Sequence, residues 1–235
     1  MTHPLILKLQ TLGELPADDL RLLESLTDDV RSFTARRDII REGQVPTHVH
    51  LMLEGWSCRY QIVEDGQRQI TALLMPGDFC DAQITILQRM DHGILTLTPS
   101  KVAFIPRETM LRLTDRPAIA RALWWASLVD EAVLRAWIVN LGRRDAVSRV
   151  AHLFCEVFAR LAHVGLTDGN EFQLPLTQEQ LADATSLTSV HVNRVLRVLR
   201  EEGLATSHLG KISIKDVARL QQMSGFDPSY LHLSG

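Results

Sequence analysis

The stretch that decides the fold runs from residue 177 to residue 200 and reads Thr177-Gln-Glu-Gln-Leu-Ala-Asp-Ala-Thr-Ser-Leu-Thr-Ser-Val-His-Val-Asn-Arg-Val-Leu-Arg-Val-Leu-Arg200. Thr177 and Gln180 have the spacing of a capping box, in which each side chain bonds the other residue's backbone amide, so a helix begins here. After a break, Thr188 or Ser189 can cap a second helix. The stretch therefore predicts two short helices joined by a tight turn.

The second of these helices has one apolar stripe and an arginine-rich remainder. The stripe recurs at helical spacing and consists of Val192, Val195, Leu196 and Leu199. The remaining positions are Ser189, Val190, His191, Asn193, Arg194, Arg197 and Arg200. A helix that buries one face and presents arginines on the other suits the major groove of DNA. Surface arginines are also common on ordinary amphipathic helices, so this pattern alone does not decide the function.

The residues that follow favour DNA binding. Gly203-Leu204 ends the second helix, and residues 204–208 and 211–214 have the pattern of a hairpin with glycine at its turn. Helix, turn, helix and a two-stranded wing make up the winged form of the helix-turn-helix motif. We therefore expect this region to bind DNA.

The composition is that of an ordinary globular protein. At 235 residues, with 46% apolar and 23% charged residues, the chain is long enough for two domains. No apolar run approaches the roughly 18 residues that span a bilayer, and the amino terminus lacks a signal-peptide pattern. We therefore expect a cytoplasmic protein with no membrane partner. Cys58, Cys80 and Cys155 show no paired spacing, so small buried hydrophobes are expected rather than a disulfide framework or zinc site.

The net charge of −3 is unevenly distributed along the chain. Residues 143–219 carry ten Lys/Arg and nine Asp/Glu, whereas residues 1–142 carry fifteen and eighteen. The acid excess therefore lies away from the predicted DNA-binding region. A region with so small a positive charge should bind phosphate only moderately, so its specificity would depend on dimerisation.

Before this region, short apolar runs alternate with turn signals. A short leading helix is expected over residues 12–26. The runs cover residues 38–40, 49–53, 56–63, 69–75, 94–97 and 102–105. Many short strands at this spacing favour a β-barrel or jelly roll.

Residues 116–141 have the pattern of one long helix of about 26 residues, or roughly 39 Å. Its apolar stripe contains Leu123, Ala126, Val133, Leu134, Trp137 and Ile138. Such a stripe needs cover, either from the barrel or from the same helix of a second subunit, and we favour the second alternative. A hinge is expected at Gly142 to Asp145, followed by an amphipathic helix over 146–161, a loop over 163–169 and a short strand over 172–174.

The order of barrel, long helix and winged helix-turn-helix resembles the Crp/Fnr family of bacterial transcription regulators over about residues 12–220. The shared marks are Glu42-Gly43, Leu53-Glu-Gly55, Leu74-Met-Pro-Gly-Asp-Phe79, Gly142-Arg-Arg144 and residues 177–203. The resemblance implies an α+β fold with a cyclic-nucleotide-binding-like barrel over 12–115, a dimerisation helix over 116–141 and a winged helix-turn-helix over 143–220. It also implies a homodimer without enzymatic activity, whose partners are a palindromic double-stranded DNA operator and RNA polymerase.

The resemblance also assigns roles within the second helix. Ser189, Val190, His191 and Arg194 lie where these relatives place base-reading residues, with Thr188 and Gln178 near the DNA backbone. Arginine can bond guanine through two hydrogen bonds, so Arg194 is the expected principal contact. Val190 stands where the best-known members carry glutamate, so a different operator is expected. Thr177, Asn193 and Arg197 complete the expected DNA-binding set.

The effector site departs from the cyclic-AMP-responsive relatives, which use a Gly-Glu pair for the ribose and Arg-Ser/Thr for the phosphate. Here Ala82 replaces the carboxylate, and His92-Gly93 stands near the place of the arginine and hydroxyl. A buried phosphodiester without its arginine lacks a charge-assisted partner. We therefore expect a signal other than cyclic AMP, no cofactor and no metal, and leave the effector residues unassigned. A cyclic nucleotide that bound nonetheless would need another arginine, such as Arg89.

Two alternatives from other classes remain open. His48-Val-His50 followed by Glu54 resembles the first metal motif of cupin enzymes, but the second motif needs a histidine that residues 76–81 do not supply. A metal-dependent cupin-type enzyme would also leave residues 177–214 unexplained. The other alternative is a nucleotide-binding interaction module that never touches DNA.

Overall fold

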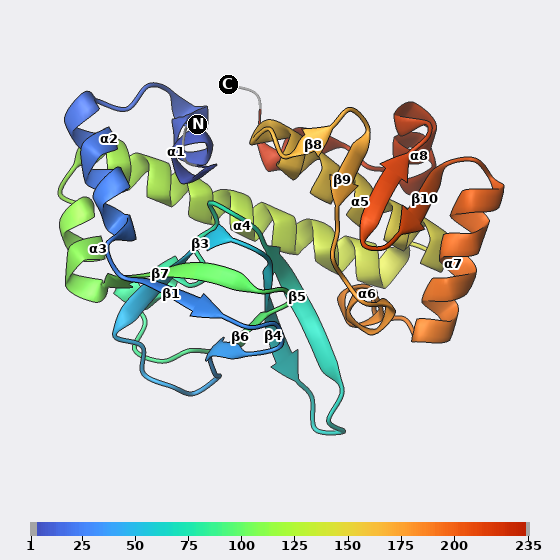
Figure 1. Ribbon diagram of the computed structural model, residues 1–235, viewed down its shortest axis with the longest axis horizontal. Helices are drawn as coiled ribbons and strands as arrows, with labels where there is room; N and C mark the ends of the chain where they lie inside the picture. The colour runs from blue at the N-terminus through green and yellow to red at the C-terminus, as the bar shows by residue number, and fades with distance from the viewer. Residues whose placement is uncertain (1–3, 234–235) are drawn as a thin grey trace. The chain divides into compact units, whose positions relative to one another are not determined.

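The computed structural model describes residues 4–233, and its chain divides into two compact units, one ending at Asp130 and one beginning at Glu131 (Figure 1). Residues 1–3, part of the amino terminus examined for a signal peptide, lie outside the described residues. Among the described residues, no helix has the length and apolar character needed to cross a membrane. The two units are described separately.

The first unit is built on two antiparallel sheets. One sheet has the order β1-β7-β3, formed by Val30–Phe33, Ser100–Pro106 and His48–Glu54. The other has the order β2-β6-β4-β5, formed by Asp38–Ile40, Gly93–Thr96, Ser57–Ile62 and Arg68–Leu74. The predicted runs are thus strands, and β1 is one that the sequence patterns did not separate.

Tight turns connect these strands, and one of them requires glycine. Gly55, which follows β3, has a φ of 82°. A Cβ at this position would lie 2.4 Å from the carbonyl oxygen of Pro99, closer than any side chain allows. The glycine in the Leu53-Glu-Gly55 motif therefore serves the close approach of two backbones.

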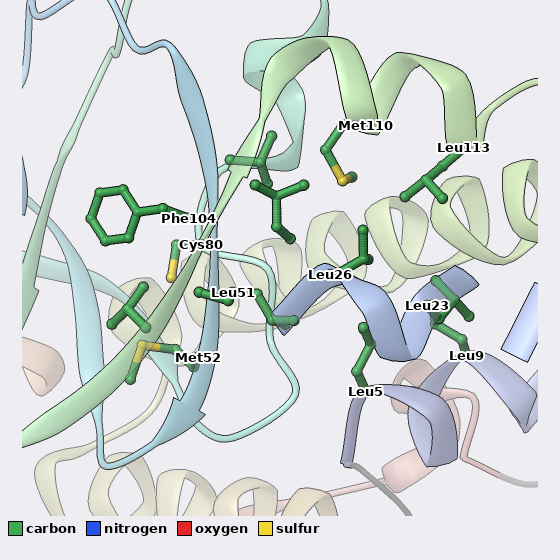
Figure 2. Packing of buried hydrophobic residues seen from close by; sticks show 14 of the residues in the cluster. Leu5, Leu9, Leu23, Leu26, Leu51, Met52, Cys80, Phe104, Met110 and Leu113 are labelled. Carbon is green, nitrogen blue, oxygen red and sulfur yellow. The ribbon is translucent and has the colours of Figure 1, made fainter. Parts of the chain in front are cut away.

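A hydrophobic core joins the sheets to the helices of the first unit (Figure 2). Leu51 and Met52 of β3 are fully buried, and Phe104 of β7 lies close by. Met110 and Leu113 come from α3 (Arg107–Leu113). Burying each such side chain contributes about 1.5–3 kcal/mol, so this cluster is the main stabilising feature of the unit.

The leading helical region differs from the prediction of one helix over 12–26. It contains α1, η1, α2 and η2, which span Pro4–Leu9, Gln10–Leu12, Ala17–Glu24 and Ser25–Thr27. Gly13 adopts a φ of 138°, and Pro16 precedes α2 with an extended backbone. Glycine and proline therefore divide the helical segment that the leucine pattern joined.

The long predicted helix is present as α4, Pro117–Arg143. The break lies within the range predicted for the hinge, Gly142 to Asp145, but at its end: Gly142 and Arg143 are helical, and the chain turns at Arg144 and Asp145. The Asp145 carboxylate accepts hydrogen bonds from the amides of Val147 and Ser148, both at 2.9 Å. This cap begins α5 (Ala146–His163), so the break between the helices is set by aspartate rather than by glycine.

The second unit places α5 against the remaining helices, α6 (Gln178–Thr185), α7 (Ser189–Glu201) and α8 (Val217–Ser224). Its antiparallel sheet has the order β10-β11-β9-β8, formed by Ala205–His208, Lys211–Ile214, Glu171–Gln173 and Thr167–Asp168. The predicted hairpin is confirmed, but it belongs to a four-stranded sheet. Part of the predicted loop over 163–169 is β8, which is too short to show a pattern. The α8 helix and the turn η4 (Pro228–Leu231) were not predicted.

Candidate DNA-binding site

The first helix of the motif, α6, begins with the predicted capping box. The Thr177 hydroxyl accepts a hydrogen bond from the Gln180 amide at 3.1 Å, and the Gln180 side chain accepts one from the Thr177 amide at 2.9 Å. The opposite face of α6 buries Leu181, Ala182 and Ala184. Two satisfied amides and a buried face hold the start of the motif in place.

The turn between α6 and α7 is held from α5. Ser186 adopts the left-handed conformation with a φ of 50° and ends α6. Arg149 of α5 donates to the carbonyl oxygen of Thr185 at 2.8 Å and to that of Arg144 at 3.1 Å. Arg149 therefore connects the turn to the start of α5, a role that no sequence motif indicated.

The second helix, α7, begins at the predicted cap, because the Thr188 hydroxyl accepts a hydrogen bond from the His191 amide at 3.2 Å. Val192, Val195 and Leu199 are buried, and Leu196 is half-buried. The predicted apolar stripe therefore attaches α7 to the unit, and α7 contacts α5 and α6.

The other face of α7 is open to solvent. Ser189 is half-buried, and the exposed residues are Thr188, Val190, His191, Asn193, Arg194, Arg197 and Arg200. The side chain of Arg194 has no hydrogen-bond or ion-pair partner among residues 4–233, which leaves its guanidinium free for a ligand. Arg197 lies 3.8 Å from Glu201 of the same helix, an exposed pair that contributes little to stability. Val190 is 62% exposed, so its side chain is open to a partner outside the chain.

Two residues of the predicted set bond each other across the motif. Gln178 of α6 donates to Asn193 of α7 at 2.7 Å, and Asn193 donates back to Gln178 at 2.6 Å. This reciprocal amide pair ties the beginning of α6 to α7. Both side chains remain exposed, so each keeps one donor and one lone pair for a further partner.

The wing is the β10–β11 hairpin, which has a two-residue turn. Leu209 and Gly210 have φ values of 49° and 76°, as a type I′ turn requires. Leu209 is 91% exposed at the tip. The left-handed backbone conformation costs a leucine free energy, and at this exposure no packing within the hairpin offsets that cost.

The six residues predicted to form the dimer seam lie on more than one face of α4. Leu134 and Ile138 are exposed, at 46% and 64%. Leu123 and Ala126 are partly buried and pack against the core of the first unit. Val133 and Trp137 are already buried within one chain, so their assignment to a seam is corrected. The indole Nε1 of Trp137 donates to both carboxylate oxygens of Glu156 at 3.1 Å, which explains its burial.

The exposed apolar face of α4 contains residues that the prediction omitted. The omitted residues are Trp124, Leu128 and Val139, which are 69%, 47% and 51% exposed. They form this face together with Leu134 and Ile138. The prediction followed the strongest apolar periodicity, which is the face that packs within the protomer. The second face is weaker in pattern because Glu131 and Arg135 lie along it.

Residues 77–83, which contain Ala82 of the predicted effector site, are bonded closely to the barrel. Asp81 is buried and accepts hydrogen bonds from the His50 amide at 2.7 Å and from His50 Nδ1 at 2.6 Å. His48 instead bonds the Thr47 hydroxyl at 2.9 Å. The two histidines considered for a metal site therefore have separate partners, and no metal-binding cluster occurs among residues 4–233.

An arginine enters this region from β4. Arg59 donates to the carbonyl oxygens of Cys80 at 2.8 Å and Phe79 at 3.1 Å. It also forms an ion pair with Asp130 of α4 at 2.8 Å. Arg89, the other arginine that the sequence offers for this place, is exposed and donates to the Gly43 carbonyl oxygen. No motif indicated Arg59, because a single arginine on a strand has no spacing signature.

His92 lies near the predicted position of the effector arginine, and the three cysteines are the remaining reactive groups of the chain. Burial lowers the pKa of His92, and its Nε2 is buried without a partner among the described residues. Burial raises the pKa of the Cys80 thiol well above its ordinary value. Cys58, Cys80 and Cys155 are all free and buried, as predicted. A thiol with a raised pKa is a poor nucleophile at neutral pH.

A sheet unit, a long helix and a winged helix-turn-helix whose second helix has a free, arginine-bearing face define the class of two-domain DNA-binding regulators. Comparison with known proteins agrees. The sequence pattern of the Crp-like helix-turn-helix domain matches residues 148–223, and that of the cyclic nucleotide-binding domain matches residues 30–116.

Relatives match most of the chain. It is 29% identical over 218 residues to the transcriptional activator protein FnrL of Cereibacter sphaeroides, covering 90% of this chain and 86% of that protein. It is 28% identical over 214 residues to the nitrogen fixation regulation protein FixK of Bradyrhizobium diazoefficiens, covering 90% and 88%. The structure of FixK2 from Bradyrhizobium japonicum has the same fold, with a TM-score of 0.75 at 23% identity over 83% of this chain and 96% of that one.

The chain belongs to the Crp/Fnr family of bacterial transcription regulators and is a DNA-binding transcription regulator. The predicted family, fold class and general function are confirmed. The individual DNA contacts, the domain limits, the dimer and the signal are taken up as proposals.

Proposed function

We propose that this protein is a homodimer that reads a palindromic operator with α7, and that Arg194 makes its principal base contact. The observation that carries the proposal is the exposed guanidinium of Arg194, which has no partner among residues 4–233. On the same face, Ser189, Val190 and His191 are near enough to the helix start to reach base edges. Val190 offers an apolar contact to a thymine methyl group.

The remaining residues of the set have supporting roles. Thr177, Gln178 and Thr188 lie at helix starts, where free amides and hydroxyls can bond phosphate. The Gln178–Asn193 pair positions the two helices on each other, so we assign Asn193 a positioning role beside its DNA contact. Arg197 lies about two helical turns beyond the start of α7 and meets the phosphate backbone.

In the proposed dimer, the exposed apolar face of α4 packs against the same face of a second copy of the chain. Isolated apolar side chains are normal on protein surfaces, but these five all lie on one helix, α4, and gather along one side of it. A single recognition helix covers only a few base pairs, so a second copy is also needed to select a site in a genome. The proposed division is a barrel over 12–115, the helix over 116–141 and the DNA-binding domain over 143–220.

The proposed partners are operator DNA, the second copy and RNA polymerase, which meet in the cytoplasm. The proposal includes no enzymatic activity. FnrL of Cereibacter sphaeroides is named a transcriptional activator, which supports activation. The barrel serves a signal other than cyclic AMP, because Ala82 supplies no carboxylate for a ribose. No observation favours the cupin-type enzyme or the interaction module.

The test is selection of operator DNA from a random pool by the wild-type protein and by Arg194→Ala. We expect the wild type to enrich a palindrome and Arg194→Ala to lose one base preference in each half-site, about 1–3 kcal/mol of discrimination. Arg200→Ala is the matched control, one arginine on the same helix. It should weaken binding to all sequences evenly and reduce the salt dependence by about one phosphate contact. Unchanged selectivity in Arg194→Ala would show that α7 is misassigned.

A further inference from the structure

An ion pair between Arg59 of β4 and Asp130 of α4 adds a polar contact to the apolar packing of the long helix on the barrel. The Arg59 side chain is 17% exposed, whereas its partner Asp130 is 50% exposed. Most surface ion pairs are formed by two mobile side chains and contribute little. Here the guanidinium is held in advance by the carbonyl oxygens of Phe79 and Cys80 at 3.1 and 2.8 Å. Asp130 therefore meets a cation whose position is already determined.

The segment that holds Arg59 is itself rigidly attached. Asp78 forms an ion pair with Lys8 of α1 at 2.5 Å and accepts a hydrogen bond from the Met75 amide at 2.8 Å. The Asp81 carboxylate accepts hydrogen bonds from the backbone amide and from the ring of His50. Residues 78–81 are thus held by α1 and β3, while Arg59 extends the same connection to α4.

Asp130 lies near the middle of α4. It is the last residue of the first compact unit, and α4 continues without a break to Arg143. The next residue, Glu131, pairs with Arg135 of the same helix at 2.7 Å and with no other residue between 4 and 233; both side chains are about 60% exposed. Of these two adjacent carboxylates, Asp130 connects α4 to β4, whereas Glu131 pairs within α4.

We propose that the Arg59–Asp130 pair is a clamp between residues 78–81 and α4, supplied by the chain's own side chains, and that operator binding depends on it. The clamp fixes α4 against residues 78–81, and the exposed apolar face of the same helix is the proposed dimer seam. This inference rests on the proposed homodimeric, operator-binding function. It adds Arg59 and Asp130 as positioning residues far from the DNA contacts.

The test compares Asp130→Ala with its neighbour Glu131→Ala in the full-length protein. Each change removes one negative charge from α4 and introduces a good helix former. We expect Asp130→Ala to lower operator affinity about fivefold or more, the range of coupling between distant sites, and Glu131→Ala to leave it unchanged. Asp130→Glu, which keeps the carboxylate, should retain most of the affinity. Affinity for non-specific DNA and dimer mass by light scattering should match the wild type in all three.

A double variant shows whether the two residues act together. In an Arg59→Met background, Asp130→Ala should cause little further loss of operator affinity, because the clamp is already absent. Equal losses in Asp130→Ala and Glu131→Ala, additive losses in the double variant, or dissociation of Asp130→Ala into monomers would each overturn the clamp. If the wild-type protein selects no operator, the proposed function fails first. If it selects one and Asp130→Ala binds it normally, only the clamp fails.

Discussion

His152 of α5 lies in an aromatic cluster of the C-terminal unit. Its ring stacks on Tyr230 at a centroid distance of 6.1 Å and meets the edge of Phe226 at 5.2 Å. The side chain is 2% exposed, and its Nδ1 is buried without a partner among residues 4–233. Burial, with a smaller contribution from the positive charge of Arg144, lowers the pKa of His152 to about 4.

This pKa gives the fold a dependence on pH. In the unfolded chain histidine titrates near pH 6.5, so between pH 6.5 and about 4 the unfolded state binds a proton that the folded state does not. The contribution is fully present above pH 6.5 and is lost as the pH falls. At pH 4 the loss is on the order of 3 kcal/mol.

His152→Phe should remove this acid sensitivity. Phenylalanine fits the aromatic contacts and leaves no buried ring nitrogen, so stability at pH 7 should be unchanged or slightly higher. Between pH 7 and pH 5 the free energy of unfolding of the variant should fall less than that of the wild type, as measured by urea denaturation. His208→Phe, at an exposed position of β10, is the control. Parallel pH profiles for the wild type and His152→Phe would contradict the assignment.

Individual residues also show where sequence patterns stop being informative. Arg194 could be singled out because helical periodicity places it opposite a buried stripe. Arg59 could not, because its three partners come from residues 79, 80 and 130, which no local spacing relates to it. Arg149 is a similar case, because it lies on α5 but bonds the carbonyl oxygen of Thr185 in the turn after α6, and no local spacing relates the two residues.

Elements were predictable where a pattern had both a period and an end signal. The helix-turn-helix had a capping box, an apolar stripe and a terminal glycine, and its two helices lie where predicted. The strands β3 to β7 had turn residues between them. β8 has two residues and α8 has eight, too few for periodicity to distinguish them from loop. For α4, apolar periodicity predicted the helix but not its exposed apolar face. The stronger period marks the residues that pack within the protomer.

The exposed face of α4 gives the prediction for the dimer. Ile138→Glu would place a charge on the proposed seam, twice per dimer, at a cost on the order of several kcal/mol. We expect light scattering to report a monomer that has lost operator affinity while its circular dichroism is unchanged. Val133→Glu is a poorer test, because Val133 is buried in the protomer and the change would disturb folding.

A control for this experiment comes from another helix. Leu111 of α3 is 42% exposed and lies outside the proposed seam, so Leu111→Glu should remain dimeric and bind the operator. If Ile138→Glu stayed dimeric, the seam would have to lie on a different surface.

The whole molecule resembles a cyclic-nucleotide regulator in fold but should not respond to cyclic AMP. Ala82 and His92 cannot replace the carboxylate and guanidinium of such a site, and Arg59 is engaged by two carbonyl oxygens and Asp130. Titration calorimetry with millimolar cyclic AMP should therefore show no saturable heat. A micromolar dissociation constant would contradict this and would mean that the nucleotide phosphate displaces Asp130 from Arg59.

The central claim is that two copies of this chain read one operator through α7. The most direct measurement is the mass of the complex on a selected operator, by analytical ultracentrifugation, combined with a hydroxyl-radical footprint. The account predicts two protomers per operator and two protected half-sites about one helical turn apart, 10–10.5 base pairs. One protomer per site, or a single protected segment, would contradict it.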